Sequence, residues 1–244
     1  MTNGDRSGDL LGLRPFGDAV KVMSQGVVDG AGAFLSRICL PAAEEFGLLL
    51  QDKVRAYRGR NVVNVLASAQ AKLPEGGDEG VHALPRLVGA VLEEASWVED
   101  QALQEKWAGL LASACSPDGL DDSNLLFVDL LRRLTRVQVR IVDYACRTAN
   151  KRRTKLGLII PQPLLLELAP LQEVAGVTDV QRLDRELDHL RSLELLQQGG
   201  FPMHFNASVA TITPTPLALH MYVRCQGSQQ SPVDYFGVPP DAEG

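Results

Sequence analysis

The 244-residue chain has few cysteines, no long apolar run and no excess of basic residues. Charges at Lys21, Asp29, Arg37 and Glu44 interrupt the N-terminal region, so no uncharged apolar run approaches the roughly 18 residues that a membrane span requires. The four cysteines are far apart without a C-x-x-C pair, and no signal peptide follows Met1. We therefore expect a cytoplasmic protein that does not span a membrane.

Histidines and catalytic motifs are scarce as well. The four histidines, His82, His189, His204 and His220, lie in separate segments, each without a second ligand at metal-binding spacing. The chain has no G-x-S-x-G, P-loop, G-x-G-x-x-G or H-E-x-x-H sequence. We predict neither a metal ion nor a cofactor, and we expect a protein without enzymatic activity.

What the chain does contain is a sizeable share of apolar residues, 45%. In most segments these residues recur at steps of three and four positions. This spacing predicts a mainly α fold, in which a helical unit precedes a winged-helix-like unit with a small β-hairpin. The expected boundaries are a flexible N-terminus at 1–15, an α-helical domain at 16–129, a winged-helix-like domain at 130–227 and a disordered acidic tail at 228–244.

The first domain begins with a glycine-rich helix at about 16–35, which should be weak unless something packs on it. Peripheral contact of this helix with a membrane surface is one alternative. A helix at 41–57 follows, and Asn61 is expected to cap the next one. Ser96 and Glu99 have the spacing of a capping box for the helix whose apolar stripe includes Trp107. We expect Trp107 in the core.

The second domain begins with a helix that Thr135 and Gln138 should cap. The elements expected after it are helices at 163–168 and 179–193, strands at 193–197 and 210–213, and a helix at 215–224. Three helices followed by a hairpin is the order of a winged helix, whose third helix would read DNA. Acidic residues outnumber basic ones in 179–193, which disfavours sequence-specific DNA recognition.

Charge is unevenly distributed along the chain. Residues 74–129 carry 12 acidic and 2 basic side chains, whereas residues 130–155 carry 9 basic and 1 acidic. The candidate acidic partner face is Glu93, Glu94, Glu99, Asp100 and Glu105. The candidate anion or partner patch is Arg136, Arg140, Arg147, Lys151, Arg152, Arg153 and Lys155, in which the stripe along one helix side continues into residues 151–155.

The basic patch has three interpretations. In the first, the patch complements the acidic block within the chain or between copies, or is simply a solvated face. In the second, it binds a nucleic-acid backbone. In the third, it binds an anionic partner protein or a lipid. We favour the first, because a block of matching charge adjoins it. A small hydrolase built from His82, Glu93, Glu94 and Glu99 is an alternative, as is a winged-helix regulator that binds nucleic acid.

Residues 84–112 carry a resemblance to a known family. The pattern E-x-A-S begins at Glu93, and L-x-x-x-W-A-x-L-L-A begins at Leu103. This arrangement resembles the Abi-alpha (abortive infection alpha) family of bacteria, and weaker similarity extends over most of the chain. The resemblance implies a role in defence against phage, in which an infected cell stops growing or dies. It implies no catalytic residues, so we expect a protein that acts by binding a partner.

Overall fold

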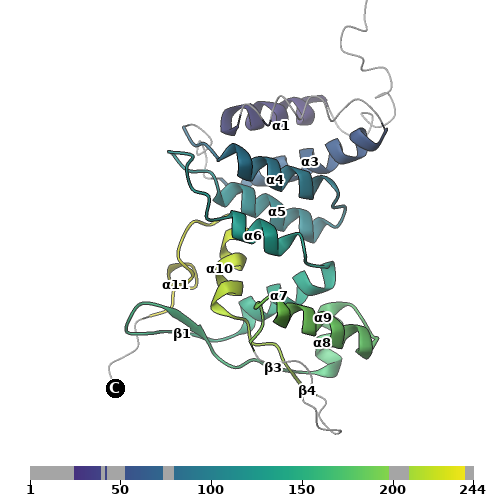
Figure 1. Cartoon of the computed structure of the whole chain (residues 1–244), viewed down its shortest axis with the longest axis vertical. Coiled ribbons are helices and arrows are strands. Elements are labelled where there is room, and N and C mark those ends of the chain that lie inside the picture. Colours follow the sequence, from purple (N-terminus) through teal and green to yellow (C-terminus); the bar gives the residue numbers. More distant parts are fainter. Residues whose placement is uncertain (1–24, 40–41, 43–52, 74–79, 198–208, 240–244) are drawn as a thin grey trace, which may run out of the picture. The chain divides into compact units, whose positions relative to one another are not determined.

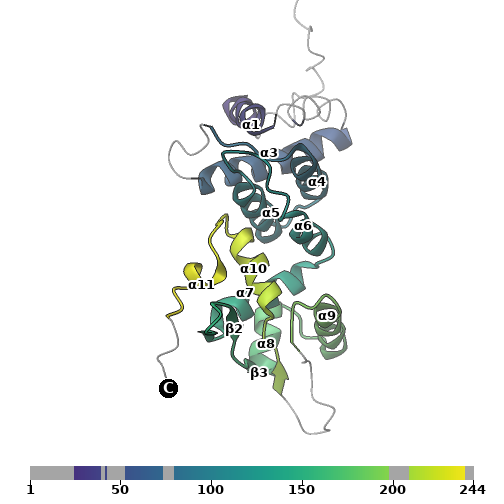
Figure 2. The same ribbon diagram turned by 60° about the vertical axis from the view of Figure 1, so that its left-hand side comes forward.

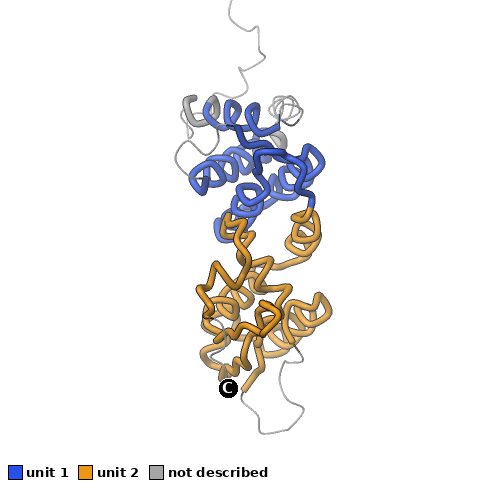
Figure 3. Tube along the Cα trace, turned by 90° about the vertical axis from the view of Figure 1, so that its left-hand side faces the viewer, with its two compact units in different colours: residues 1–122 blue, residues 123–244 orange. Residues whose placement is uncertain are grey.

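The computed structural model describes residues 25–39, 42, 53–73, 80–197 and 209–239 (Figure 1). The chain divides into two compact units, Met1–Asp122 and Ser123–Gly244 (Figure 3). This division lies a few residues before the one expected after residue 129. Helices dominate both units, and the strands of the described part form short antiparallel pairs. The predicted fold class, mainly α with a small hairpin, is therefore confirmed.

Unit 1 is built around one long central helix. Its elements are α1 (Gln25–Ile38), α3 (Lys53–Lys72), α4 (Pro85–Ser96) and α5 (Gln101–Ser113). Helix α3 packs against the other three. The fully buried side chains of this unit include Phe34, Leu35, Leu66, Leu87, Trp107, Leu110 and Leu111. The burial of Trp107, which is 1% exposed, confirms its predicted place in the core.

Two helix starts in unit 1 differ from the prediction. Asn61 lies inside α3 rather than capping a new helix, and its buried amide donates to the Ser96 carbonyl oxygen at 2.8 Å. Ser96 ends α4, so the expected capping box with Glu99 is wrong. Asp100 caps α5 instead, because its carboxylate accepts the backbone N–H of Leu103 at 3.1 Å.

Several predicted segments fall wholly or partly outside the described residues. The N-terminus at 1–15 is outside them, as is the first part of the helix expected at 16–35, whose remainder belongs to α1. Most of the helix expected at 41–57 is also outside, and its last residues belong to α3. Helix α1 packs on α3, which supplies the packing that its glycines require.

Unit 2 combines helices with two short antiparallel strand pairs, and the first of these pairs follows the second helix of the unit. Its elements are α6 (Leu125–Leu131), α7 (Arg136–Thr148), β1 (Lys151–Arg153), β2 (Ile159–Pro161), β3 (Leu165–Glu167), α8 (Leu168–Ala175), α9 (Val180–Ser192), β4 (Val209–Thr211), α10 (Pro216–Cys225) and α11 (Pro232–Tyr235). Strand β3 pairs with β4, and Leu196 forms a bridge with Pro214. Thr135 and Gln138 form the predicted capping box of α7.

Two predictions for unit 2 are corrected by the structure. The helix expected at 163–168 is strand β3 followed by the start of α8, because residues 165–167 pair with β4. The basic stripe does not continue along α7, since the helix ends at Thr148 and residues 151–153 form β1. The turn expected at 199–202, between the two predicted strands, lies outside the described residues.

The expectation of disorder at 228–244 is wrong for residues 228–239. This segment contains the short helix α11, capped by Ser231, with Val233 buried. Tyr235 and Phe236 pack against Tyr222 of α10, at ring-centroid distances of 6.2 and 5.8 Å. Aromatic burial therefore holds a segment whose polar composition gave little sign of order.

Candidate functional site

The hairpin formed by β1 and β2 is closed by a tight loop. The backbone N–H of Thr154 donates to the Leu158 carbonyl at 2.8 Å, and its hydroxyl accepts the Leu158 N–H at 3.0 Å. Gly157 donates to the Thr154 carbonyl and has φ +82°, a left-handed conformation that glycine adopts without strain. A short loop that ends on a left-handed glycine is a common hairpin connection. Lys155 and Leu156 consequently occupy the tip.

One face of this hairpin combines apolar and cationic side chains. Arg152 and Ile160 lie directly opposite each other, so their side chains share a face, and alternation adds Leu158. Leu156, Leu158 and Ile160 are 86%, 62% and 45% exposed. We call the set Arg152, Lys155, Leu156, Leu158 and Ile160 the hairpin face. Large aliphatic side chains gathered at a surface protrusion indicate a contact site.

The cations of the hairpin have no acidic neighbour nearby in the sequence. The sequence has no acidic residue from 144 to 166. Among the described residues, no ion pair involves Arg152, Arg153 or Lys155, whereas Arg147 is paired with Asp143 on α7 at 3.0 Å. Within the described part of the chain, the hairpin therefore combines cations that lack an ion-pair partner with exposed leucines.

The opposite face of the hairpin is fixed to the body of unit 2. Ile159 and Pro161 are buried, and β2 contacts α10. The ammonium of Lys151 donates to the Ala149 carbonyl at 2.6 Å and lies over the ring of Phe236. Burial lowers the pKa of Lys151 from its usual value. Lys151 is thus an anchoring residue, although the sequence had placed it in the anion-binding patch.

The helical part of the predicted basic patch has a different setting. Arg136, Arg140 and Arg147 lie along exposed positions of α7. Arg140 reaches Gly176, the left-handed residue that ends α8, where its Nη1 lies 2.6 Å from the position of an added Cβ. Of these three arginines, Arg147 is paired with Asp143.

Several members of the predicted acidic face in unit 1 are engaged within that unit. Glu93 pairs with Arg58, whose guanidinium lies 4.5 Å above the ring of Trp97. Glu105 accepts hydrogen bonds from Lys72 and Ser68, and the contact with Lys72 lowers its pKa.

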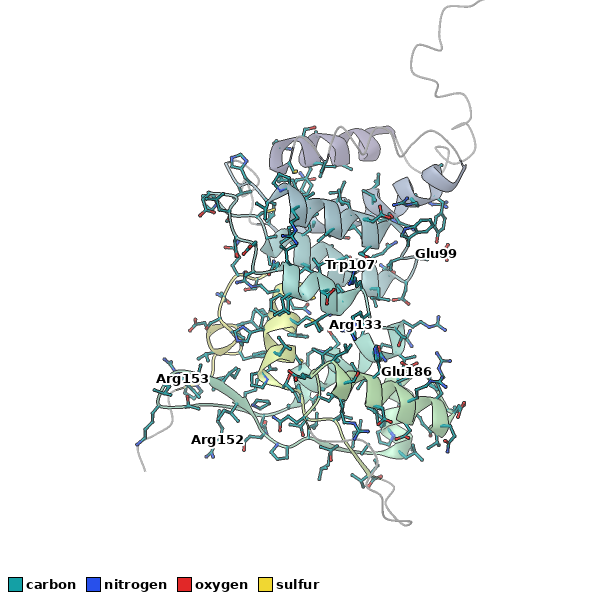
Figure 4. The ribbon with its side chains drawn as sticks, in the orientation of Figure 1. Glu99, Trp107, Arg133, Arg152, Arg153 and Glu186 are labelled. Atoms are coloured by element: carbon teal, nitrogen blue, oxygen red, sulfur yellow. The ribbon has the colours of Figure 1, made fainter. Side chains whose placement is uncertain are left out.

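Asp100 is equally engaged, because it caps α5. Glu94 and Glu99 belong to the same predicted face. Figure 4 shows Glu99 at one end of unit 1, with Trp107 in its interior. The acidic face is thus partly neutralised by its own unit.

An open polar groove of about 690 Å³ lies between α3 and α5. It is lined by Arg60, Asn61, Asn64, Ala67, Ser68, Glu99, Gln101, Gln104 and Glu105. Asn61 and Gln104 are buried, and the Gln104 amide donates to the Val98 carbonyl oxygen at 2.7 Å. These two polar core residues were not predicted, because nothing local in the sequence brings α3 and α5 together.

Helix α9, the counterpart of a DNA-reading helix, uses much of its charge internally. Arg182 pairs with Glu186, and Arg191 pairs with Asp188. The buried carboxylate of Glu186 also accepts the hydroxyl of Thr135 at 3.0 Å, which ties α9 to the start of α7. Figures 1 and 2 show α9 and the β1–β2 hairpin on opposite sides of unit 2. In Figure 4 the labelled Arg152 and Arg153 lie away from Glu186.

The residues of the hydrolase alternative do not converge. His82 precedes α4 and pairs with Ser116, while Glu93 lies near the end of that helix. Two turns of helix, about 12 Å of rise, separate the two ends. No group of three potential metal ligands occurs within the described residues. All four cysteines are buried thiols outside any disulfide, and burial raises the pKa of the Cys115 thiol to about 12.

Comparison with known proteins agrees with the pattern around Trp107. The profile of the abortive infection alpha family matches residues 55–214, which reach from α3 in unit 1 to the residues after β4 in unit 2. No match was found among curated proteins or among solved structures. In the described part of the chain, no helix is both long enough and apolar enough to cross a membrane. The matched region covers well over half of the sequence, and the chain belongs to the abortive infection alpha family.

Proposed function

We propose that this chain acts in abortive infection without catalysing a reaction, as an interaction protein that binds its partner through the hairpin face. The observation that carries the proposal is the exposure of Leu156 and Leu158 beside Arg152 and Lys155, which form no ion pair with any residue that the structure describes. Leaving leucines in water forgoes the free energy of burying them, which contact with a partner would recover.

The contacts of the acidic residues in unit 1 argue against the acidic block as the partner of these cations. Glu93, Asp100 and Glu105 are already paired or capping within unit 1. The hairpin face, in contrast, combines charge with apolar area that an acidic surface alone would leave uncovered. An external partner therefore fits the hairpin better than the complementarity favoured from sequence.

A nucleic-acid-binding regulator is the second candidate, because the element order of unit 2 is that of a winged helix. Helix α9 gives it little support, since Arg182 and Arg191 pair with acids of the same helix.

We also place the chain in the cytoplasm. The four buried cysteines, which form no disulfide, support that assignment, because a reducing compartment keeps cysteines as thiols.

Phage infection of cells that express the chain tests this function. We expect Leu156→Ser/Leu158→Ser to lose protection, scored as efficiency of plating, while His82→Ala/Glu99→Gln keeps it. Leu120→Ser is the matched control, because Leu120 is another exposed leucine, at 71%, and lies in unit 1. Protection that survives the hairpin change and disappears with His82→Ala/Glu99→Gln would instead support an enzyme.

A further inference from the structure

We propose that the hairpin face docks unit 2 onto an anionic lipid surface, with Leu156 and Leu158 entering the headgroup region while Arg152 and Lys155 contact lipid phosphates. This inference rests on the proposed function, because it names the partner of the same face.

The shape of the hairpin suits a fluid surface. Leu156 lies at the tip of a protruding loop and is 86% exposed, more than any other large apolar side chain that the structure describes. In Figure 1 the hairpin projects from the body of unit 2. A convex apolar tip needs a partner that can deform around it, and lipid headgroups and the upper acyl chains can do so.

Charge complementarity points to acidic rather than neutral lipid. Arg152 and Lys155 flank the leucines, and no acidic residue occurs between 144 and 166. Basic side chains next to a membrane are attracted by the negative potential of acidic lipids. Their aliphatic stems can lie along the apolar region while the charges reach the phosphates.

Part of the backbone of the hairpin turn is paired within the turn. Thr154, Gly157 and Leu158 are joined by three hydrogen bonds of the turn. Entry of unpaired backbone groups into lipid would be costly, so these three bonds lower the cost of bringing the base of the turn near the headgroups. The inner face, held by Ile159 and Lys151, keeps the depth of insertion shallow.

The residue types of the hairpin argue against a nucleic acid or a protein as the partner. The segment from 151 to 161 has no aromatic residue. Proteins that bind single strands stack bases on aromatic rings, and phosphates gain nothing from exposed leucines. Energetic centres of protein interfaces are enriched in tryptophan, tyrosine and arginine, and lysine is depleted there. Leucines flanked by lysine and arginine fit lipid better.

Co-sedimentation of the purified full chain with vesicles tests the inference. One vesicle is phosphatidylcholine alone, and the other contains phosphatidylglycerol in addition. We expect binding to the acidic vesicle only, weakened at least about tenfold by Leu156→Ser/Leu158→Ser and abolished by Arg152→Glu/Lys155→Glu. Leu120→Ser and Arg86→Glu are the controls, since both residues are exposed in unit 1 and should not affect binding. Thermal melting establishes that each variant is folded.

Other outcomes would overturn the inference. Absence of binding to the acidic vesicle, or equal binding by the leucine variant, contradicts it. Binding to a labelled oligonucleotide that Arg152→Glu/Lys155→Glu removes and the leucine variant retains would assign the face to nucleic acid. If the leucine variant loses phage protection although the wild type binds no vesicle, only the lipid inference fails. If the leucine variant still protects, the proposed function fails as well.

Discussion

The ammonium nitrogen of Lys151 lies 4.1 Å from the centroid of the Phe236 ring. This cation–π contact joins the first strand of the hairpin to the segment that follows α11. The contact gives the C-terminal segment a structural role, because it fixes the inner face of the hairpin whose outer face carries Arg152.

This relationship predicts a measurable coupling between the two residues. In a double-mutant cycle of Lys151→Met and Phe236→Leu, followed by chemical denaturation, we expect a coupling free energy of about 0.5–1 kcal/mol. Methionine and leucine keep much of the apolar volume, so the cycle isolates the charge–ring contact. Strictly additive effects would show that Lys151 and Phe236 do not stabilise each other.

The second prediction concerns Tyr222 and alkaline pH. Burial raises the pKa of Tyr222 above its ordinary value of 10.0. Below pH 10 the phenol is neutral in both states, so its contribution to stability is fully present. Above pH 10 the unfolded chain ionises first, and the free energy of unfolding falls. We expect Tyr222→Phe to make the decline between about pH 9 and 11 shallower, and parallel profiles would argue against it.

The two tryptophans of the chain provide a matched pair for core packing. Trp107 is 1% exposed and Trp97 is 54% exposed. We expect Trp107→Ala to lower the free energy of unfolding by about 3–5 kcal/mol, since it removes a buried aromatic ring. Trp97→Ala should cost less than about 1.5 kcal/mol, mainly through the lost contact with Arg58. Similar losses at the two positions, measured by urea denaturation, would contradict the described core.

Gly176 and Arg140 allow backbone strain to be separated from a side-chain clash. Gly176 has φ +68°, so Gly176→Ala should destabilise the chain by about 1–2 kcal/mol. The added Cβ would also meet the Arg140 guanidinium, but this is the flexible end of a long side chain. We therefore expect Arg140→Ala to recover less than about 0.5 kcal/mol of the loss. Full recovery would mean that the clash, not the strain, dominates.

Local signals explain most of what the sequence could predict. The capping box of Thr135 and Gln138 and the stripe through Trp107 depend on residues within a few positions of one another. The errors arise where contacts with distant segments of the chain determine the local structure. Asn61 looks like a cap, yet its partner is Ser96 on α4. Residues 165–167 become a strand because β4, more than 40 positions later, pairs with them.

The hairpin itself could have been found from sequence. Gly157, three residues after Thr154, is the kind of glycine that closes a short hairpin loop. The regular spacing of Arg140, Arg147 and Lys151 instead suggested one helix face, and it concealed the end of α7 at Thr148. The exposure of the leucines could not be predicted, because apolar residues in such a segment are expected to be buried.

A fluorophore at the tip of the hairpin tests the central claim most directly. The native cysteines are at most 5% exposed, so an environment-sensitive maleimide dye should label Leu156→Cys selectively. Leu120→Cys gives the matched exposed control in unit 1. When phosphatidylglycerol vesicles are added, the account predicts a blue shift of the emission at position 156 and none at position 120. An unchanged emission at position 156, or an equal shift at both positions, would contradict it.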